Sequence, residues 1–224
     1  LLASLATYSS DTTIRREATL SLGGHYVRHG RYERGAEVLG EVLAAFERPS
    51  DRWRVRFWIA SALMGTRETV ASAEAFREAA AEAPERSRAR AIALRLSGWQ
   101  YRRAELDSEA QEVWRAALSA AGGFPSLQDT LRQDLAEVSF ADEDWEDVIA
   151  LLGTDHPGGR MTARSRFLLG RAYLNAGEPD SARTQFEHFL QIHPEAPEAW
   201  RDEAHLLLGW EALRRKEPAR ALAY

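Results

Sequence analysis

Small residues recur among the apolar positions of the chain at a constant internal spacing. One set of positions holds Gly or Ala: Gly23, Ala60, Gly98, Ala136, Gly170 and Gly209. A second set lies twelve residues after each of these and is small at every position but one: Gly35, Ser72, Ala110, Val148, Ala182 and Ala221. Steps of 37, 38, 38, 34 and 39 residues separate the members of the first set, so the chain contains an internal repeat.

This spacing predicts pairs of helices in close contact. Two helices approach closely only where the facing side chains are small. Larger residues nearby, such as Tyr173 and Phe186, would fill the rest of the interface. Turn formers at 30–32 and 177–179 separate the two helices. We therefore predict an all-α fold of about six helical hairpins, over residues 12–47, 52–84, 88–121, 127–156, 160–194 and 199–224. The second helix of the fourth hairpin should be short, because the sequence His-Pro-Gly-Gly at 156–159 would end it early.

The fifth hairpin carries the most informative residues. Leu169-Gly170 precedes Tyr173, and Ala182, Phe186 and Pro194 follow. This series resembles the tetratricopeptide repeat, with Arg166 where the family usually has Trp. The same frame covers about residues 16–224. The resemblance implies a right-handed α-solenoid forming a single domain over residues 1–224.

The two ends of the chain do not match complete hairpins. The segment 1–8 reads as the tail of an earlier helix, and Tyr224 falls within an expected second helix. Solenoids need polar capping units at their ends, and no such unit is visible in this sequence. We therefore expect the sequence to be part of a longer protein.

Composition narrows the class of partner. The net charge is −5, whereas nucleic-acid-binding proteins normally carry a basic excess, so we expect none of that class. No apolar run approaches the roughly 18 residues of a membrane helix, so we expect no direct membrane insertion. Cysteine is absent, which leaves the compartment open between the cytoplasm and the periplasm or cell envelope of a bacterium. The bacterial source is inferred from basic residues that are almost all arginine, with Lys216 the exception.

Candidate chemistry is sparse. His25 and His29 lie four residues apart, a spacing that suits a metal, but no third ligand accompanies them. The acidic run at 142–147 suits a helix start better than a calcium loop, which would need a central Gly and a terminal Glu. No combination of nucleophile, base and orienting group is evident. We therefore expect no catalysis, no metal and no cofactor.

The resemblance implies that the first helices line a concave groove that holds a protein or peptide. The residues expected on this face, away from the packing stripe, are Arg28, Phe57, Met64, Arg95, Trp99, Arg102, Arg103, Phe140, Phe167, Arg171 and Asn175. Trp99 with its neighbouring arginines forms the most adhesive predicted patch, because Trp and Arg dominate binding hot spots. It would select a partner with acidic residues beside an apolar anchor. The alternative is that Trp99 packs against the neighbouring hairpin.

Three functional readings follow. The leading one is a protein-interaction scaffold, and the last two hairpins loosely resemble bacterial cell-envelope members of the family, such as outer-membrane assembly lipoproteins. A second is the non-catalytic helical domain of a larger enzyme, for example a lytic transglycosylase. A third is the sensor region of a regulator. The family's chaperone-binding subclass is not indicated, because Gly24, Ser61, Trp99, Glu137 and Arg171 occupy its asparagine row.

Overall fold

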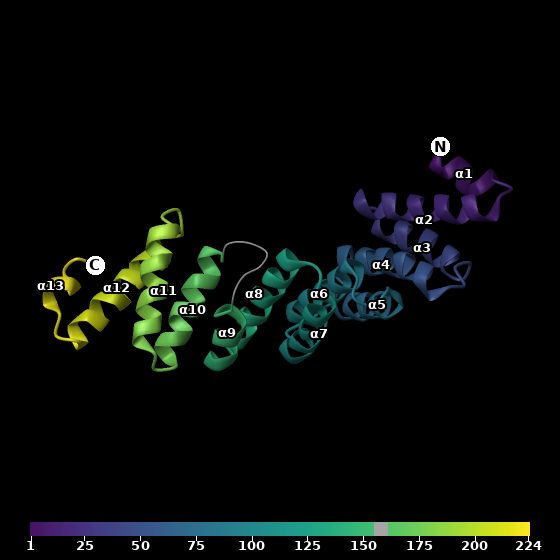
Figure 1. The fold of residues 1–224 in the computed structure, drawn as a ribbon. Coiled ribbons are helices and arrows are strands. Elements are labelled where there is room, and N and C mark those ends of the chain that lie inside the picture. Colours follow the sequence, from purple (N-terminus) through teal and green to yellow (C-terminus); the bar gives the residue numbers. More distant parts are fainter. Residues whose placement is uncertain (155–160) are drawn as a thin grey trace. The chain divides into compact units, whose positions relative to one another are not determined.

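The structure is a computed structural model that describes residues 1–154 and 161–224. Its described residues form helices and turns without any strand, which confirms the all-α prediction (Figure 1). The helices are α1 (Leu2–Tyr8), α2 (Thr12–Arg28), α3 (Tyr32–Leu43), α4 (Pro49–Gly65), α5 (Thr69–Glu82), α6 (Arg88–Arg103), α7 (Asp107–Ala120), α8 (Pro125–Ala141), α9 (Trp145–Leu152), α10 (Ala163–Asn175), α11 (Pro179–Ile192), α12 (Glu198–Arg214) and α13 (Pro218–Ala221).

Six antiparallel hairpins follow the predicted order. They pair α2 with α3, α4 with α5, α6 with α7, α8 with α9, α10 with α11, and α12 with α13. In each, we call the earlier helix the first helix and the later one the second. The predicted boundary residues 156 and 160, and the turn at 156–159, lie outside the described residues. The expected short helix of the fourth hairpin is α9, with 8 residues.

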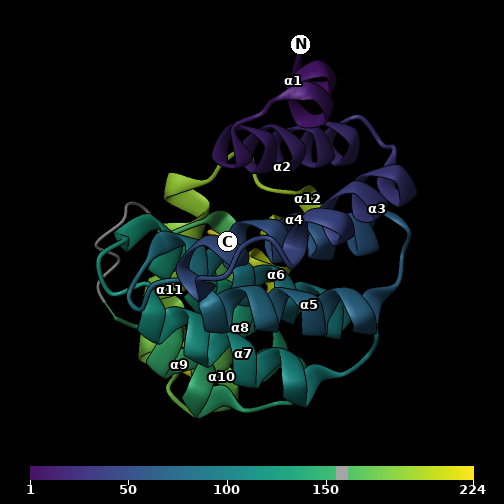
Figure 2. The ribbon, with the colours of Figure 1, turned by 90° about the vertical axis from the view of Figure 1, so that its right-hand side faces the viewer.

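The hairpins fall into two compact units, residues 1–124 (unit 1) and 125–224 (unit 2). Unit 1 contains α1 to α7, with α1 lying against α2 (Figure 2). Unit 2 contains α8 to α13. A single domain over residues 1–224 therefore stays a prediction.

Every hairpin turn uses the same backbone conformation. The residue seven positions after each small residue of the first helix has a positive φ: Gly30, Arg67, Glu105, Glu143, Gly177 and Lys216. The next residue donates its backbone N–H five residues back, as Arg31 does to Tyr26 at 2.9 Å and Leu106 does to Tyr101 at 3.0 Å. This is the Schellman helix ending, which satisfies the last carbonyls of the first helix. Four of the six positions hold a residue with a side chain, for which this conformation is unfavourable.

Close contacts between the two helices lie where the small residues predicted them. A Cβ on Gly35 would stand 3.2 Å from the carbonyl oxygen of Gly23, and Ser72 donates a hydrogen bond to the Ala60 carbonyl at 2.9 Å. At Gly98 the nearest group is the Trp114 indole, and at Gly170 it is the Phe186 ring. The second helix therefore presses an aromatic ring onto the glycine, rather than only the small residue one turn earlier.

Each unit has its own apolar core. In unit 1, Leu39, Val55, Phe76 and Trp114 are fully buried. In unit 2, Phe186 and Phe189 are buried in one cluster with Ala204 and Leu208 of α12. Burial of these large side chains supplies most of the favourable free energy of folding.

Candidate functional site

In unit 1, the first helices of the hairpins are basic and the second helices are acidic. The first helices, α2, α4 and α6, carry eleven arginines and two acidic residues. The second helices, α3, α5 and α7, carry three arginines and nine acidic residues. The chain as a whole has a net charge of −5, so the basic layer is a local property of the first helices.

Some of this charge is neutralised within the second hairpin. Arg52 forms an ion pair with Glu82 at 2.7 Å, and Arg56 pairs with both Glu82 and Glu78. Arg54 pairs with Glu17 of α2 at 3.1 Å. These pairs tie the helices together and reduce the number of arginines available to a ligand.

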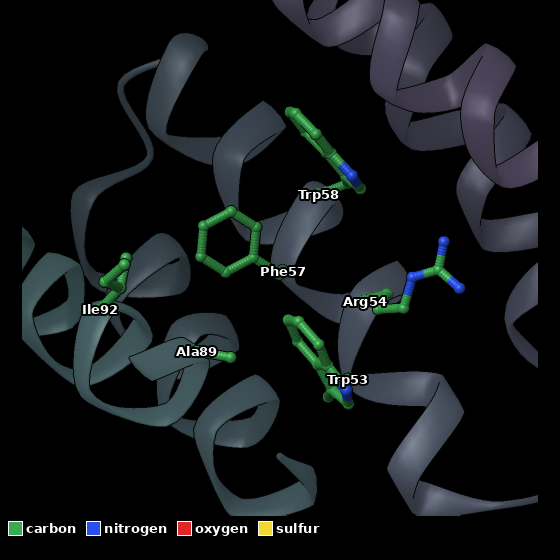
Figure 3. A pocket seen from close by; sticks show the side chains of 6 residues that line it. All are labelled: Trp53, Arg54, Phe57, Trp58, Ala89 and Ile92. Atoms are coloured by element: carbon green, nitrogen blue, oxygen red, sulfur yellow. The ribbon is translucent and has the colours of Figure 1, made fainter. Parts of the chain in front are cut away.

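An apolar pocket of about 300 Å³ opens between α4 and α6 (Figure 3). Trp53, Phe57 and Trp58 come from α4, while Ala89 and Ile92 come from α6. Arg54 completes the lining. We call this the aromatic pocket. All three aromatic rings are half-buried, so they present both a packed edge and an accessible one.

The neighbouring helix α2 holds Trp58 in place and adds a cation. A Cβ on Gly24 would stand 3.0 Å from the Trp58 ring, so the indole packs directly on the α2 backbone. The Arg28 guanidinium lies 5.1 Å from the centre of the same ring. Arg28 is exposed and, among the described residues, pairs with no carboxylate. A cation over an indole face is attracted by the ring while its remaining donors stay available.

The predicted groove residues of unit 1 lie in different environments. Phe57 lines the aromatic pocket and also packs edge-on against Phe76. Met64 packs against the core cluster of Ala60 and Phe76. Sequence reasoning missed Trp53 and Trp58. Trp53 could have been found by extending the stripe of Phe57 back by one helical turn, whereas Ala89 and Ile92 enter only through the placement of α6.

The predicted Trp99 patch is half-buried. Trp99 packs edge-on against the buried Trp114 at 5.7 Å, and Arg102 lies 6.0 Å from its ring. Arg103 is exposed. Arg95 and Arg102 each have further interaction partners within the protein. The role of the patch in binding stays a prediction.

In unit 2, one predicted groove residue is in the core. Phe167 is only 4% exposed, because it stacks on Trp200 at 5.7 Å and packs against Phe189 at 5.6 Å. The prediction that Phe167 faces the groove is therefore wrong. Arg171 lies 5.1 Å from the Phe140 ring and pairs with Glu203 at 3.5 Å.

The remaining predicted residue of unit 2 lies at a helix end. Asn175 is exposed and is the last residue of α10. It therefore remains accessible, at the start of the turn to α11.

The two histidines and the acidic run do not form a metal site. The His25 and His29 rings lie 4.1 Å apart, and a hydrogen bond of 2.8 Å joins His29 Nδ1 to the His25 carbonyl. Within residues 1–154 and 161–224, no group of three or more His, Asp or Glu side chains is placed to hold a metal ion. The acidic run starts α9, where Asp144 accepts the backbone N–H of Asp147 at 3.0 Å. None of the described helices is long and apolar enough to cross a membrane.

Comparison with known families agrees with the repeat geometry. Two tetratricopeptide repeat family models match residues 20–87 and 163–206, which together make half of the chain. The chain belongs to the tetratricopeptide repeat family. No curated protein matches its sequence.

Several solved structures share the fold of this chain. MamA is 14% identical with a TM-score of 0.64, covering 80% of this chain and 92% of MamA. The apo form of RapI is 12% identical with a TM-score of 0.69, covering 99% of this chain and 66% of RapI. A putative kinesin light chain from Podosopora anserina with TPR-like repeats is 18% identical with a TM-score of 0.57. The match covers 82% of this chain and 97% of the kinesin light chain structure. At these identities the likeness concerns the fold alone.

Proposed function

We propose that this tetratricopeptide repeat protein is an interaction scaffold that holds an acidic protein segment on the first helices of unit 1. The aromatic pocket is the observation that carries the proposal. It offers an apolar site for one anchor side chain, and ligand sites are typically concave and apolar with a few polar groups. Arg28 beside Trp58 would receive a carboxylate next to that anchor.

A protein ligand suits this surface better than a nucleic acid does. The pocket wall is aromatic and aliphatic, and several arginines of α4 already pair with glutamates. Tetratricopeptide repeat proteins are generally non-catalytic scaffolds, and we include no catalytic step in the proposed function. The arginine excess of the first helices would speed encounter with an acidic partner and make binding weaken as salt rises.

The test is a peptide array in which each probe has one Trp, Phe or Leu flanked by Asp and Glu. Matched probes lack the anchor or carry Asn and Gln, and an oligonucleotide serves as the nucleic-acid probe. We expect binding only when anchor and acids are both present. Ala89→Phe, which fills the pocket, and Arg28→Glu should each weaken binding at least about tenfold.

Two control variants match these changes. Arg34→Glu makes the same charge change on the second helix α3, and Ala116→Phe adds the same ring at an exposed position on α7. Both should bind like the parent chain. Equal loss in variants and controls, or binding of the oligonucleotide but not of the peptides, would contradict the proposal.

A further inference from the structure

The turn between α8 and α9 carries a tryptophan within a run of acidic residues. Residues 142–147 read Asp-Glu-Asp-Trp-Glu-Asp, so every residue of this segment except Trp145 is acidic. Among the seven tryptophans of the chain, Trp145 alone has an acidic residue on both sides. An apolar anchor flanked by acids is the chemistry that the aromatic pocket and its neighbouring arginines suit, so the chain carries a matching segment of its own.

The fold uses only part of this acidic run. Asp144 accepts the backbone N–H of Asp147 at 3.0 Å and so caps α9. Asp147 in turn accepts a hydrogen bond of 2.6 Å from the Ser139 hydroxyl. Glu143 and Glu146 are exposed, and within the described residues neither side chain has a hydrogen bond or an ion pair. These two glutamates are therefore available to a partner.

Trp145 presents an apolar edge in a fixed position. Its side chain is half-buried and packs edge-on against Phe140, with ring centres 5.2 Å apart. The Arg171 guanidinium lies 5.1 Å from the same Phe140 ring. Because this packing already restricts the indole, binding of its accessible edge would cost little further side-chain entropy.

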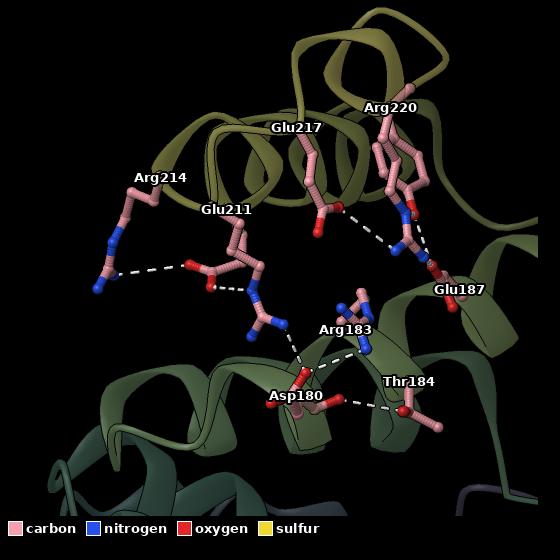
Figure 4. Close-up of polar contacts among 10 residues, drawn as sticks. Asp180, Arg183, Thr184, Glu187, Glu211, Arg214, Glu217 and Arg220 are labelled. Atoms are coloured by element: carbon pink, nitrogen blue, oxygen red, sulfur yellow. Dashed lines mark hydrogen bonds and ion pairs between the residues drawn. The ribbon is translucent and has the colours of Figure 1, made fainter.

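Several other carboxylates of unit 2 are already paired (Figure 4). Asp180 pairs with Arg215 at 2.8 Å, and Glu187 pairs with Arg220 at 2.9 Å. The hydrogen bond from Arg215 lowers the pKa of Asp180. Glu211 also pairs with Arg215, at 2.9 Å. These carboxylates hold α11 and the last hairpin together, whereas the two glutamates of the α8–α9 turn make no such contact in the described structure.

Two arginines beside the aromatic pocket can receive these glutamates. Arg28 lies over the Trp58 ring, and Arg88 precedes the pocket residue Ala89 at the start of α6. Both arginines are exposed, and within the described residues neither pairs with a carboxylate. They come from different helices, so each can bind a separate carboxylate.

We propose that the α8–α9 turn of a second copy of this chain docks in the aromatic pocket, an inference that rests on the function proposed above. The edge of Trp145 enters the pocket, and the two glutamates approach Arg28 and Arg88. The turn is acidic and the first helices of unit 1 are basic, so the two surfaces are complementary in charge as well as in apolar character.

A second copy is favoured over the turn of the same chain. The pocket is built by the second and third hairpins, whereas the turn belongs to the fourth. In a repeat protein each hairpin contacts only its neighbours, so we do not expect the fourth hairpin to contact the second within one chain. The contact joins two different surfaces, so it either closes reciprocally between two copies or continues along a row of copies.

Sedimentation of the whole chain over a range of concentrations tests this contact. We expect concentration-dependent association that weakens as salt rises. Trp145→Ala and Glu146→Arg should each weaken it at least about tenfold. Glu198→Arg makes the same charge change at an exposed residue in the first turn of α12 and should leave association unchanged. Circular dichroism checks that each variant is folded. A chain that stays monomeric at all concentrations would overturn the proposal.

Mixing two variants tests which surfaces meet. Ala89→Phe fills the pocket and keeps the turn, whereas Glu146→Arg changes the turn and keeps the pocket. Each variant alone should associate weakly. An equimolar mixture should associate more tightly than either, because an intact pocket then meets an intact turn. A mixture that associates no better than its components would overturn this pairing of surfaces.

Peptide binding separates this proposal from the function on which it rests. The probe is the peptide of residues 141–148, which should bind the Glu146→Arg chain more tightly than the parent at concentrations where the parent associates. If acidic anchor peptides bind but the chain does not associate, only the docking of a second copy is wrong. If no such peptide binds, the proposed function fails as well. A gain in affinity that is the same at every concentration would indicate docking within one chain and would also overturn the proposal.

Discussion

Gly98 faces the indole of Trp114, the largest fully buried side chain of the protein. A Cβ at this position would stand 2.3 Å from Trp114 Nε1. That nitrogen donates a hydrogen bond of 3.0 Å to the Arg95 carbonyl, so the indole cannot move away without losing this bond. A methyl group therefore has to force α6 and α7 apart.

Gly98→Ala should consequently lower the free energy of unfolding by about 1–3 kcal/mol, the usual cost of overpacking. Gly40→Ala is the matched control. Gly40 lies within α3 and has no atom near the position of a Cβ, so Ala there should stabilise by about 1 kcal/mol through helix propensity. Urea denaturation of both variants measures the difference. Equal effects of the two substitutions would contradict a close contact at Gly98.

For single residues, the sequence predicted where the two helices of a hairpin touch better than it predicted which side chains meet there. Gly23, Gly98 and Gly170 are where the helices touch, as their spacing indicated. The side chain that packs on each glycine depends on the rotamer of a residue that is distant in the sequence. Phe167 shows the same limit: its place on the helix was correctly assigned, but its burial depends on Trp200 of the next hairpin.

At the scale of single elements, the positive φ in the turn of each hairpin can be tested by mutation. Glu105 and Glu143 both have φ of 60° and are exposed, and no interaction of either side chain is found in the described structure. A residue with a side chain in this conformation destabilises the folded state by about 1–2 kcal/mol. Gly avoids this strain, but it makes the unfolded chain more flexible, which cancels part of the gain in stability.

Glu105→Gly should therefore stabilise the protein by about 0.5–1 kcal/mol. The reverse change is available in the same structural position. Gly177 has φ of 80°, so Gly177→Glu should destabilise by a similar amount. Thermal unfolding of the two variants gives opposite shifts if the turns are equivalent. Shifts of the same sign would show that the side chains, and not the backbone, decide stability here.

The helices were predictable because the repeat supplied a period, the small residues and the turn formers. The common turn conformation was not, because only Gly30 and Gly177 carry the glycine that signals it. The aromatic pocket was half predictable for a related reason. Phe57 follows from the stripe on one helix, whereas Ala89 and Ile92 join it only through the packing of α6 beside α4.

For the whole molecule, the division into unit 1 and unit 2 sets how far a perturbation should spread. In repeat proteins each hairpin contacts only its neighbours, so stability is a sum of local terms. Phe76 is a fully buried core residue of unit 1, and Phe186 is 2% exposed in the core of unit 2. Replacing either by Ala should cost about 3–5 kcal/mol locally.

Hydrogen exchange of the whole chain distinguishes local from global cooperativity. If the units open independently, Phe186→Ala should speed exchange in α10 to α12 by two orders of magnitude or more, since about 1.4 kcal/mol corresponds to a factor of ten. Exchange in α4 and α5 should stay at the parent rate. Phe76→Ala should give the reciprocal pattern, fast in α4 to α6 and unchanged in α10 and α11. If both variants accelerate exchange equally along the chain, the six hairpins unfold together and act as the single domain that the repeat pattern predicted.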